Sequence, residues 1–330
     1  MTTPLLKVEH LSVGFPSKSG VVQAVTDVAF EVHPGEVLAV VGESGSGKSV
    51  TALSIMRLHP KNTLITGEVT FDGIDLLGLK EEQMRSVRGR DIAMIFQDPM
   101  TALNPVFTVG DQIIETIRVH HEVSKNEAFD RAVDLLKMVG VPEPKRRAQQ
   151  YPHEFSGGMR QRAMIAMAIA NDPKLLIADE PTTALDVTVQ AQVMEVLHEV
   201  QAATGSAMIL ITHDLGLVAG TADRVQVMYA SRVMETGTID EIFYESRNPY
   251  TLALLDSIPD LEGTKDTLHP IPGNPPSLLR PQPGCPFAPR CKMMIDVCLE
   301  SVPDLVPINE GHASRCHRTA DIPVAVGVAS

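Results

Sequence analysis

An α/β fold built around a parallel sheet is predicted for this chain by the alternation of two kinds of segment. Helical segments begin at two capping-box sequences, residues 124–127 and 238–241, in which Ser or Thr is followed three positions later by Glu. Short apolar runs, typical of buried strands, occur at residues 37–41, 92–95, 175–178, 208–211 and 225–228. Strands that alternate with helices in this way favour a mostly parallel, covered sheet.

Other regions flank or interrupt this alternation. Residues 5–13 and 28–32 are expected to form two strands, with a polar turn at 14–20 between them. From residue 98 to about 160, helical patterns follow one another without a strand, which predicts a helical insertion. Prolines then crowd the chain, and we expect a small C-terminal part at 248–317 and a frayed tail at 318–330.

Composition excludes several classes of protein. The net charge of −13 over 330 residues argues against a general nucleic-acid binder, which usually carries a basic surface. The sequence has no run of the 18 or more apolar residues that a membrane helix needs, and its first residues lack the layout of a signal peptide. We therefore expect a cytosolic chain that serves a membrane, if at all, as a peripheral subunit.

The glycine-rich segment GESGSGKS, residues 42–49, matches the whole phosphate-binding pattern G-x-x-x-x-G-K-[ST]. Its glycines allow backbone N–H groups to surround phosphates at the positive end of the following helix. We expect Lys48 to bridge the β- and γ-phosphates and the Ser49 hydroxyl to ligate Mg²⁺. The expected phosphate-binding residues are Gly42, Ser44, Gly45, Gly47, Lys48 and Ser49.

Polar residues follow three of the apolar runs. Asp179 and Glu180 end the run LLIA, so Asp179 is a candidate to hold Mg²⁺ through its water shell and Glu180 to be the general base. Gln97 offers an amide to the metal or the attacking water, and His213 can hydrogen-bond the γ-phosphate. A lone glutamine or histidine carries no such meaning, and the order of all these segments behind the phosphate loop supports both assignments.

A second glycine-rich segment, FSGGMRQR at residues 155–162, is expected to begin another helix with Ser156 as its cap. The helix N-terminus, with Gly157 and Gly158 in its first turn, forms a second anion-binding site. One ATP needs only one such site. The sequence therefore predicts that this segment contacts the nucleotide of another molecule.

With these motifs in this order, residues 5–245 resemble the ATP-binding cassette (ABC) ATPases. The resemblance implies a P-loop NTPase (RecA-like) cassette at 1–247, with an antiparallel β subdomain and an α-helical subdomain, that binds ATP and Mg²⁺. It makes Asp186 part of the loop that contacts the opposite subunit and Phe15 a candidate to stack on adenine. It also implies the catalytic residues Glu180, His213 and Gln97 and the Mg²⁺ residues Ser49, Gln97 and Asp179.

A narrower resemblance rests on residues 154–192, on QDPMTALNP at 97–105 and on NPYT at 248–251. These segments are similar to the D-type ATPase subunits of dipeptide and oligopeptide importers. This resemblance implies peptide uptake across the bacterial cytoplasmic membrane, with the chain peripheral on the cytoplasmic face. It also implies as partners an F-type ATPase chain (a heterodimer), two permease chains and an extracytoplasmic binding protein, with no nucleic acid.

Other functions remain open at this point. Importers of nickel or other small solutes belong to the same family, and a non-transport ABC ATPase acting on DNA or ribosomes, or a metal-sensing regulator, are weaker alternatives. The signature also departs from the commoner one, because Met159 stands where glutamine is usual. We expect this exchange to weaken the contact with the partner's nucleotide.

Four cysteines lie in the C-terminal part with the spacing C-x5-C-x6-C-x17-C: Cys285, Cys291, Cys298 and Cys316. Because disulfides are disfavoured in the cytosol, clustered thiols there predict a metal site, either Zn²⁺ or an iron–sulfur cluster. The long gaps and the resemblance to D-type subunits favour a structural [4Fe–4S] cluster, with Zn²⁺ as the alternative. The neighbouring Arg290, His312 and His317 are expected to be solvated or to surround the ligands.

Overall fold

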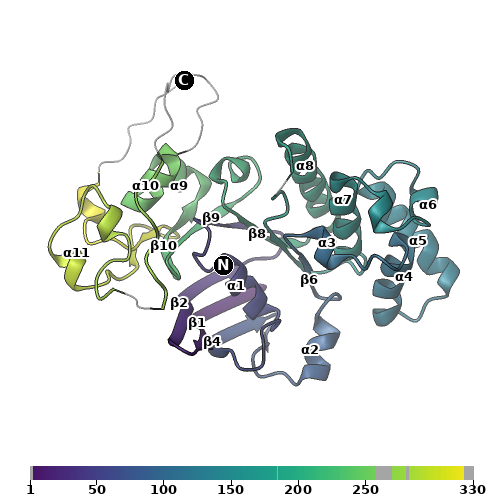
Figure 1. Ribbon diagram of the computed structural model, residues 1–330, viewed down its shortest axis with the longest axis horizontal. Coiled ribbons are helices and arrows are strands. Elements are labelled where there is room, and N and C mark those ends of the chain that lie inside the picture. The colour runs from purple at the N-terminus through teal and green to yellow at the C-terminus, as the bar shows by residue number, and fades with distance from the viewer. Residues whose placement is uncertain (1–2, 184, 258–269, 280–281, 323–330) are drawn as a thin grey trace. The chain divides into compact units, whose positions relative to one another are not determined.

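The computed structural model describes residues 3–183, 185–257, 270–279 and 282–322. It divides into two compact units, and Figure 1 labels many of their elements. The first unit consists of Met1–Leu5, Val32–Glu36 and Gly78–Ile211, and the second of Leu6–Glu31, Val37–Leu77 and Thr212–Ser330.

Three parallel strands form the sheet of the first unit. They are β6 (Ile92–Ile95), β7 (Leu175–Asp179) and β8 (Ala207–Thr212), with β7 in the middle. All their residues are buried, as expected for apolar runs in a parallel sheet. Each strand coincides within two residues with an apolar run in the sequence, and the carboxyl ends of the strands meet at one edge.

Helices make up most of the rest of the first unit. In chain order they are α2 (Glu81–Val87), α3 (Pro99–Ala102), α4 (Val109–His120), α5 (Lys125–Met138), α6 (Pro144–Arg147), η1 (Pro152–Glu154), α7 (Gly157–Ala168) and α8 (Val187–Thr204). As predicted, the described residues between β6 and β7 carry helices and no strand. The capping box that begins α5 is confirmed, since Ser124 N donates to Glu127 Oε2 at 2.9 Å and Glu127 N donates to Ser124 Oγ at 3.3 Å.

An antiparallel sheet in the second unit confirms the predicted β subdomain. Its order is β2–β1–β4–β5, formed by β1 (Leu6–Ser17), β2 (Gly20–Val32), β4 (Leu64–Phe71) and β5 (Ile74–Asp75). The strands β1 and β2 are longer than predicted, so the polar turn expected at 14–20 shrinks to residues 18–19. Pro16 fits within β1 because it lies at the exposed end of this hairpin.

The second unit also contains strands in the order β11–β12–β10–β9–β3. Of these, β3 (Val37–Val41) pairs in parallel with β9 (Arg224–Tyr229), and β10 (Arg232–Thr238) pairs antiparallel with β9. The short strands β11 (Val306–Pro307) and β12 (Ala313–Ser314) extend this edge. Two-residue strands leave no periodic pattern, so the sequence did not predict them.

The helices of the second unit are short. They are α1 (Lys48–Ile55), η2 (Leu215–Val218), α9 (Ile239–Tyr244), α10 (Pro249–Asp256), η3 (Ala288–Arg290), α11 (Val297–Glu300) and η4 (Thr319–Asp321). The second predicted capping box is confirmed at the start of α9, where Thr238 N donates to Glu241 Oε2 at 2.8 Å. Of the predicted tail at 318–330, residues 323–330 lie outside the described residues.

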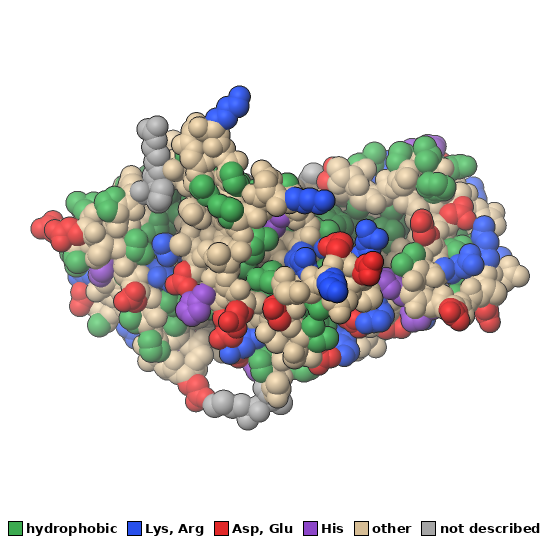
Figure 2. All heavy atoms as spheres, turned by 90° about the horizontal axis from the view of Figure 1, so that it is seen from below, with side chains coloured by type: hydrophobic (Ala, Val, Ile, Leu, Met, Phe, Trp, Pro, Cys, Tyr) green, Lys and Arg blue, Asp and Glu red, His purple; other side chains and the backbone are tan. Residues whose placement is uncertain are grey.

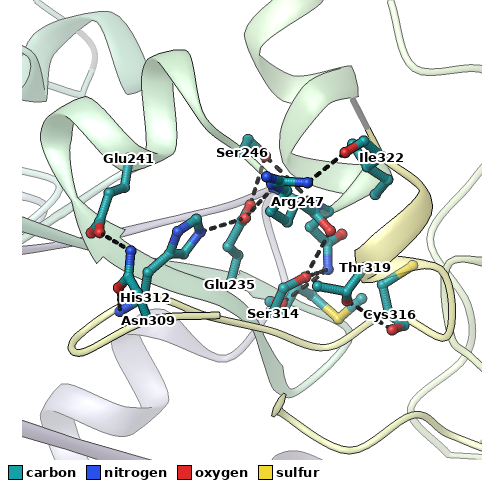
Figure 3. A network of polar contacts seen from close by, with 12 residues as sticks. Glu235, Glu241, Ser246, Arg247, Asn309, His312, Ser314, Cys316, Thr319 and Ile322 are labelled. Atoms are coloured by element: carbon teal, nitrogen blue, oxygen red, sulfur yellow. Dashed lines mark hydrogen bonds and ion pairs between the residues drawn. The ribbon is translucent and has the colours of Figure 1, made fainter. Parts of the chain in front are cut away.

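A buried carboxylate fastens the C-terminal strands to β10 (Figure 3). Glu235 is fully buried, and its Oε1 lies 3.0 Å from His312 Nε2 and accepts from Arg247 N. Its other oxygen accepts from Ser246 Oγ at 2.7 Å. Three donors therefore satisfy a carboxylate that would otherwise be costly to bury. His312, which we expected to be solvated or to surround metal ligands, is 1% exposed and belongs to this network.

Replacing Glu235 by alanine is expected to destabilise the fold by about 3 kcal/mol, because it leaves three donors without their acceptor. Thermal unfolding should show this as a drop in Tm of roughly 5–10 °C. The exposed Glu310, in the loop between β11 and β12, supplies the control Glu310→Ala, which should leave Tm within about 1 °C of wild type. Equal Tm values for the two variants would show that this network contributes nothing to stability.

On the face drawn in Figure 2, acidic and basic side chains are interspersed and do not gather into one basic area. Among the described residues, no helix combines the length and the apolar character needed to cross a bilayer.

Candidate nucleotide site

The phosphate-binding loop of the second unit is shaped by two glycines. The buried strand β3 leads into it, and α1 begins at Lys48 directly after it. Gly42 and Gly47 have φ values of 150° and 104°, which other residues rarely adopt. A Cβ at Gly42 would lie 2.0 Å from Met228 O, and one at Gly47 would lie 2.4 Å from Ala24 O. Only glycine fits at either position, so the backbone can form a tight cradle.

The buried ammonium of Lys48 lies against the inside of this loop. Lys48 is 3% exposed, and its Nζ donates to Gly42 O at 2.8 Å and to Glu43 O at 3.1 Å. At the loop tip, Ser44 and Gly45 are exposed, and a Cβ at Gly45 would meet nothing within 4 Å. The first turn of α1 has no side-chain cap, so its backbone amides and positive dipole end face the loop. These features fit the phosphates of a nucleotide.

His213 lines a cavity beside this loop. The cavity of ≈ 230 Å³ is lined by Val41, Gly42, His213, Asp214, Leu215, Leu254 and Ser257. The structure thus brings His213 to the same cavity as the first loop glycine. The sequence did not predict that α10 and the residue after it would contribute Leu254 and Ser257, because nothing in a short apolar helix indicates which surface it covers.

Phe15, the candidate adenine-stacking residue, is half-buried on β1 of the second unit. Its ring meets the ring of His59 edge to face, with centroids 5.4 Å apart. Burial lowers the pKa of His59, so that imidazole is neutral at pH 7. The role of Phe15 toward adenine stays a prediction.

In the first unit, two residues far apart in sequence meet at the end of β7. Glu180 Oε2 accepts a hydrogen bond from Gln97 Nε2 at 3.0 Å and another from Thr183 Oγ1 at 2.8 Å. Glu180 has φ +46°, an unfavourable conformation for a residue with a side chain, and such strain is concentrated at functional sites. Asp179, which precedes it, is 6% exposed. Thr183 was missed from the sequence, where a threonine three residues after an acid is an ordinary turn residue.

The second glycine-rich segment forms the start of α7 in the first unit. Ser156 is exposed and caps the helix by accepting from Met159 N at 3.4 Å. A Cβ at Gly158 would lie 2.9 Å from Val189 Cγ1 in the first turn of α8. Asp186 caps α8 by accepting from Val189 N at 3.0 Å. The starts of α7 and α8 are therefore neighbours, and the contacts of these residues with a second cassette stay a prediction.

Arg290, which is predicted to be solvated or to surround the metal ligands, instead lies buried against the phosphate-binding loop. Its side chain is 6% exposed and forms a two-pronged ion pair with Glu43 of the phosphate-binding loop. The backbone N–H of Glu43 in turn donates to Tyr250 Oη at 3.0 Å. The apolar residues of α10 are the one signal in the sequence that could have indicated packing near the phosphate-binding loop. Nothing in the sequence pairs residue 43 with residue 290.

The prediction of a [4Fe–4S] cluster, with Zn²⁺ as its alternative, is wrong. Among the described residues, no group of three or more His, Cys, Asp or Glu side chains is arranged to hold a metal ion. The cysteines line a cavity of ≈ 20 Å³, which has room for about one water molecule. Burial raises the pKa values of three thiols, that of Cys316 to about 11. The prediction rested on the cysteine spacing and on the resemblance to D-type subunits.

The raised thiol pKa of Cys316 predicts slow alkylation. At pH 8 its thiolate fraction should be about 10²-fold lower than that of an ordinary cysteine, because each pKa unit is tenfold in that fraction. Mass spectrometry should show Cys316 reacting with iodoacetamide about 10²-fold more slowly in the native chain than in urea, with the rate rising as the pH approaches 11. Equal rates in the two states at pH 8 would contradict the protonated thiol.

Comparison with known proteins assigns the family. Residues 25–183 match the family described as ABC transporter, and residues 234–298 match the oligopeptide/dipeptide transporter C-terminal region. The probable peptide ABC transporter ATP-binding protein y4tR of Sinorhizobium fredii is 53% identical over 96% of both chains. The oligopeptide transport ATP-binding protein OppD of Bacillus subtilis is 52% identical over 94% of this chain and 87% of its own.

A longer relative and a solved structure extend the comparison. OppD of Mycobacterium tuberculosis is 52% identical, and the chain spans about half of its length. A dimeric ATP-binding cassette in a post-hydrolysis state, bound to ADP and Pi, superposes with a TM-score of 0.64 at 27% identity, over 71% of this chain and 98% of its own. The predicted cassette fold is thereby confirmed.

The comparisons do not support the predicted heterodimer with an F-type chain. The curated relatives are named as ATP-binding proteins, and the solved cassette is described as dimeric. The identity over nearly the full length of y4tR is decisive for the family. The chain therefore belongs to the ABC transporter family, among the ATP-binding proteins that carry the oligopeptide/dipeptide transporter C-terminal region.

Proposed function

We propose that this chain hydrolyses ATP to power the uptake of di- and oligopeptides by an ABC importer, at the cytoplasmic face of the inner membrane. The observation that carries the hydrolytic part is the Glu180 carboxylate, held by both Gln97 and Thr183 at the end of a buried strand. The peptide part is supported by relatives named as peptide and oligopeptide transport proteins at 52–53% identity.

The phosphate-binding loop is proposed to hold the triphosphate. Gly42 and Gly47 give the backbone its curvature, Ser44 and Gly45 present their amides at the open tip, and Lys48 contacts the β- and γ-phosphates. Bound Mg²⁺ would neutralise phosphate charge, and Ser49, Gln97 and Asp179 are the residues proposed to hold it.

Glu180 is proposed as the general base. It would take a proton from the attacking water while the water oxygen bonds to the γ-phosphorus and the bond to the β–γ bridging oxygen breaks, giving ADP and phosphate. The two donors on Oε2 fix the orientation of the carboxylate before the reaction. His213 is proposed to donate a hydrogen bond to the γ-phosphate from the cavity that it shares with Gly42.

The remaining site residues are proposed to contact either the adenine or a second cassette and its ATP. Ser156, Gly157 and Gly158 would contact ATP held by a second cassette, Asp186 would contact that cassette, and Phe15 would stack on adenine. Two permease chains and an extracytoplasmic binding protein would complete the importer. In this proposal the cassette spans 1–247, with its helical subdomain at about 98–160, and residues 248–317 form the C-terminal part.

Uptake assays in a strain that lacks this chain test the function. Uptake of a labelled tripeptide should be lost and should return with the wild-type gene, whereas uptake of radioactive nickel should be unchanged. Loss of nickel uptake with normal peptide uptake would instead favour the nickel importer. Normal uptake of both would contradict a transport function of this kind.

A further inference from the structure

The phosphate-binding loop is held in place by the C-terminal part of the chain. Arg290 Nη1 donates to Glu43 Oε2 at 2.8 Å, and Nη2 donates to Glu43 Oε1 at 3.0 Å. We propose that Arg290 is a positioning residue for ATP binding, which acts by fixing Glu43 and with it the phosphate-binding loop. This inference rests on the proposed ATPase function and adds a residue that the family motifs do not contain.

The guanidinium of Arg290 is fully engaged. Besides the two bonds to Glu43, Nη1 donates to Tyr229 Oη at 3.1 Å, Nη2 to Ile271 O at 3.2 Å and Nε to Pro272 O at 2.8 Å. An arginine has five N–H groups in a rigid fork, and these five contacts match that number. The group also lies over the Tyr229 ring, 5.7 Å from its centroid. Lysine, with a compact ammonium, cannot reproduce this set.

Burial makes this ion pair different from an ordinary surface pair. The Arg290 side chain is 6% exposed and that of Glu43 is 22% exposed. Burial opposes the charge, but the hydrogen bonds to Glu43 and Tyr229 outweigh it and keep the pKa of Arg290 above its ordinary value. Removing either partner leaves a poorly solvated charge behind. The free-energy cost of losing this pair should therefore exceed that of a typical surface salt bridge.

A cluster of three aromatic rings packs beside the Arg290–Glu43 ion pair. Tyr229 ends β9, Tyr250 lies on α10 and Phe287 precedes η3, and all three rings are buried. The two tyrosine centroids are 4.4 Å apart, and Phe287 packs edge-on against both at 5.2 and 5.5 Å. Tyr250 Oη also accepts from Glu43 N at 3.0 Å. Glu43 is therefore held through its carboxylate and its backbone by the same cluster.

The contact reaches the nucleotide site through the carbonyl of Glu43. Lys48 Nζ donates to that carbonyl at 3.1 Å and to the carbonyl of Gly42 at 2.8 Å. A shift of Glu43 thus moves an acceptor of the ammonium that is proposed to bind the phosphates. A loop that is already ordered loses less entropy when ATP binds, so the pair should increase affinity more than it increases the rate of the chemical step.

Removal of Arg290 is tested in the purified full-length chain. For Arg290→Met we expect the Kd and KM for ATP to rise about tenfold while kcat changes less than about twofold. Arg290→Lys should recover only part of the loss. Glu43→Gln should raise the Kd for ATP as Arg290→Met does. The double variant should bind ATP no less tightly than either single variant, because both substitutions remove the same interaction. Arg318→Met, which breaks an exposed C-terminal pair with Asp321, is the matched control and should bind ATP as wild type does.

The outcomes separate the two levels of the proposal. If wild type binds and hydrolyses ATP and the Arg290 and Glu43 variants match it in Kd and KM, the positioning role is overturned and the proposed function stands. The same holds if the variants lose only Tm. If wild type neither binds nor hydrolyses ATP, the proposed function itself fails. Glu43→Gln keeps the side-chain shape and decides the question if Arg290→Met does not fold.

Discussion

ATP hydrolysis by the Glu180→Gln variant is expected to fall about 10³-fold, while ATP binding stays at the wild-type level. General-base catalysis contributes roughly 10²–10⁴-fold to such reactions, and an amide cannot accept the proton of the attacking water. The glutamine is nearly the same size as the glutamate, and its amide oxygen can still accept from Gln97 and Thr183, so the local structure should persist. Release of phosphate and binding of a fluorescent ATP analogue measure the two properties separately.

The matched control for this variant is Glu195→Gln, which makes the same chemical change at an exposed position on α8. It should leave both hydrolysis and binding unchanged. Hydrolysis retained by Glu180→Gln would remove Glu180 as the base, and a parallel loss of ATP binding would assign it to binding instead.

The Gly47→Ala variant is expected to lose ATP binding by roughly 10²-fold or more. Its new Cβ would stand 2.4 Å from Ala24 O, and φ at this position is +104°. The backbone must move to relieve this clash, at a cost of about 3 kcal/mol to the loop conformation that binds ATP. This free energy corresponds to a loss of roughly 10²-fold in affinity.

Gly220→Ala is the control for the glycine substitution, because a Cβ there meets nothing within 4 Å and its backbone needs no positive φ. Calorimetric titration with ATP should give a wild-type Kd for this control. Wild-type affinity in Gly47→Ala would show that the cradle tolerates a side chain and that its geometry is not needed for binding.

Local physics made much of the fold predictable. The buried strands β3, β6, β7 and β8 are continuous apolar runs, and the capping boxes of α5 and α9 place their own helix starts. The phosphate-binding loop was equally predictable, because the positive φ angles of Gly42 and Gly47 restrict those positions to glycine. In each case the sequence signal and the structural cause lie within a few residues of each other.

Contacts between distant segments could not be predicted in this way. Glu43 and Arg290 are 247 positions apart, and an arginine beside a cysteine gave no sign of its partner. Glu235 and His312 are likewise joined only by folding, 77 positions apart. The cysteine spacing and the resemblance to D-type subunits led to the prediction of an iron–sulfur cluster. Spacing carries no information about the burial of the thiols or the size of the cavity between them.

Coupling of hydrolysis to transport is tested by peptide uptake in cells in which the Glu180→Gln variant replaces this chain. We expect uptake of a labelled tripeptide to fall to the level of the deletion strain, although the variant is present and binds ATP. Uptake at the wild-type rate with the variant would contradict the claim that hydrolysis at Glu180 powers peptide import.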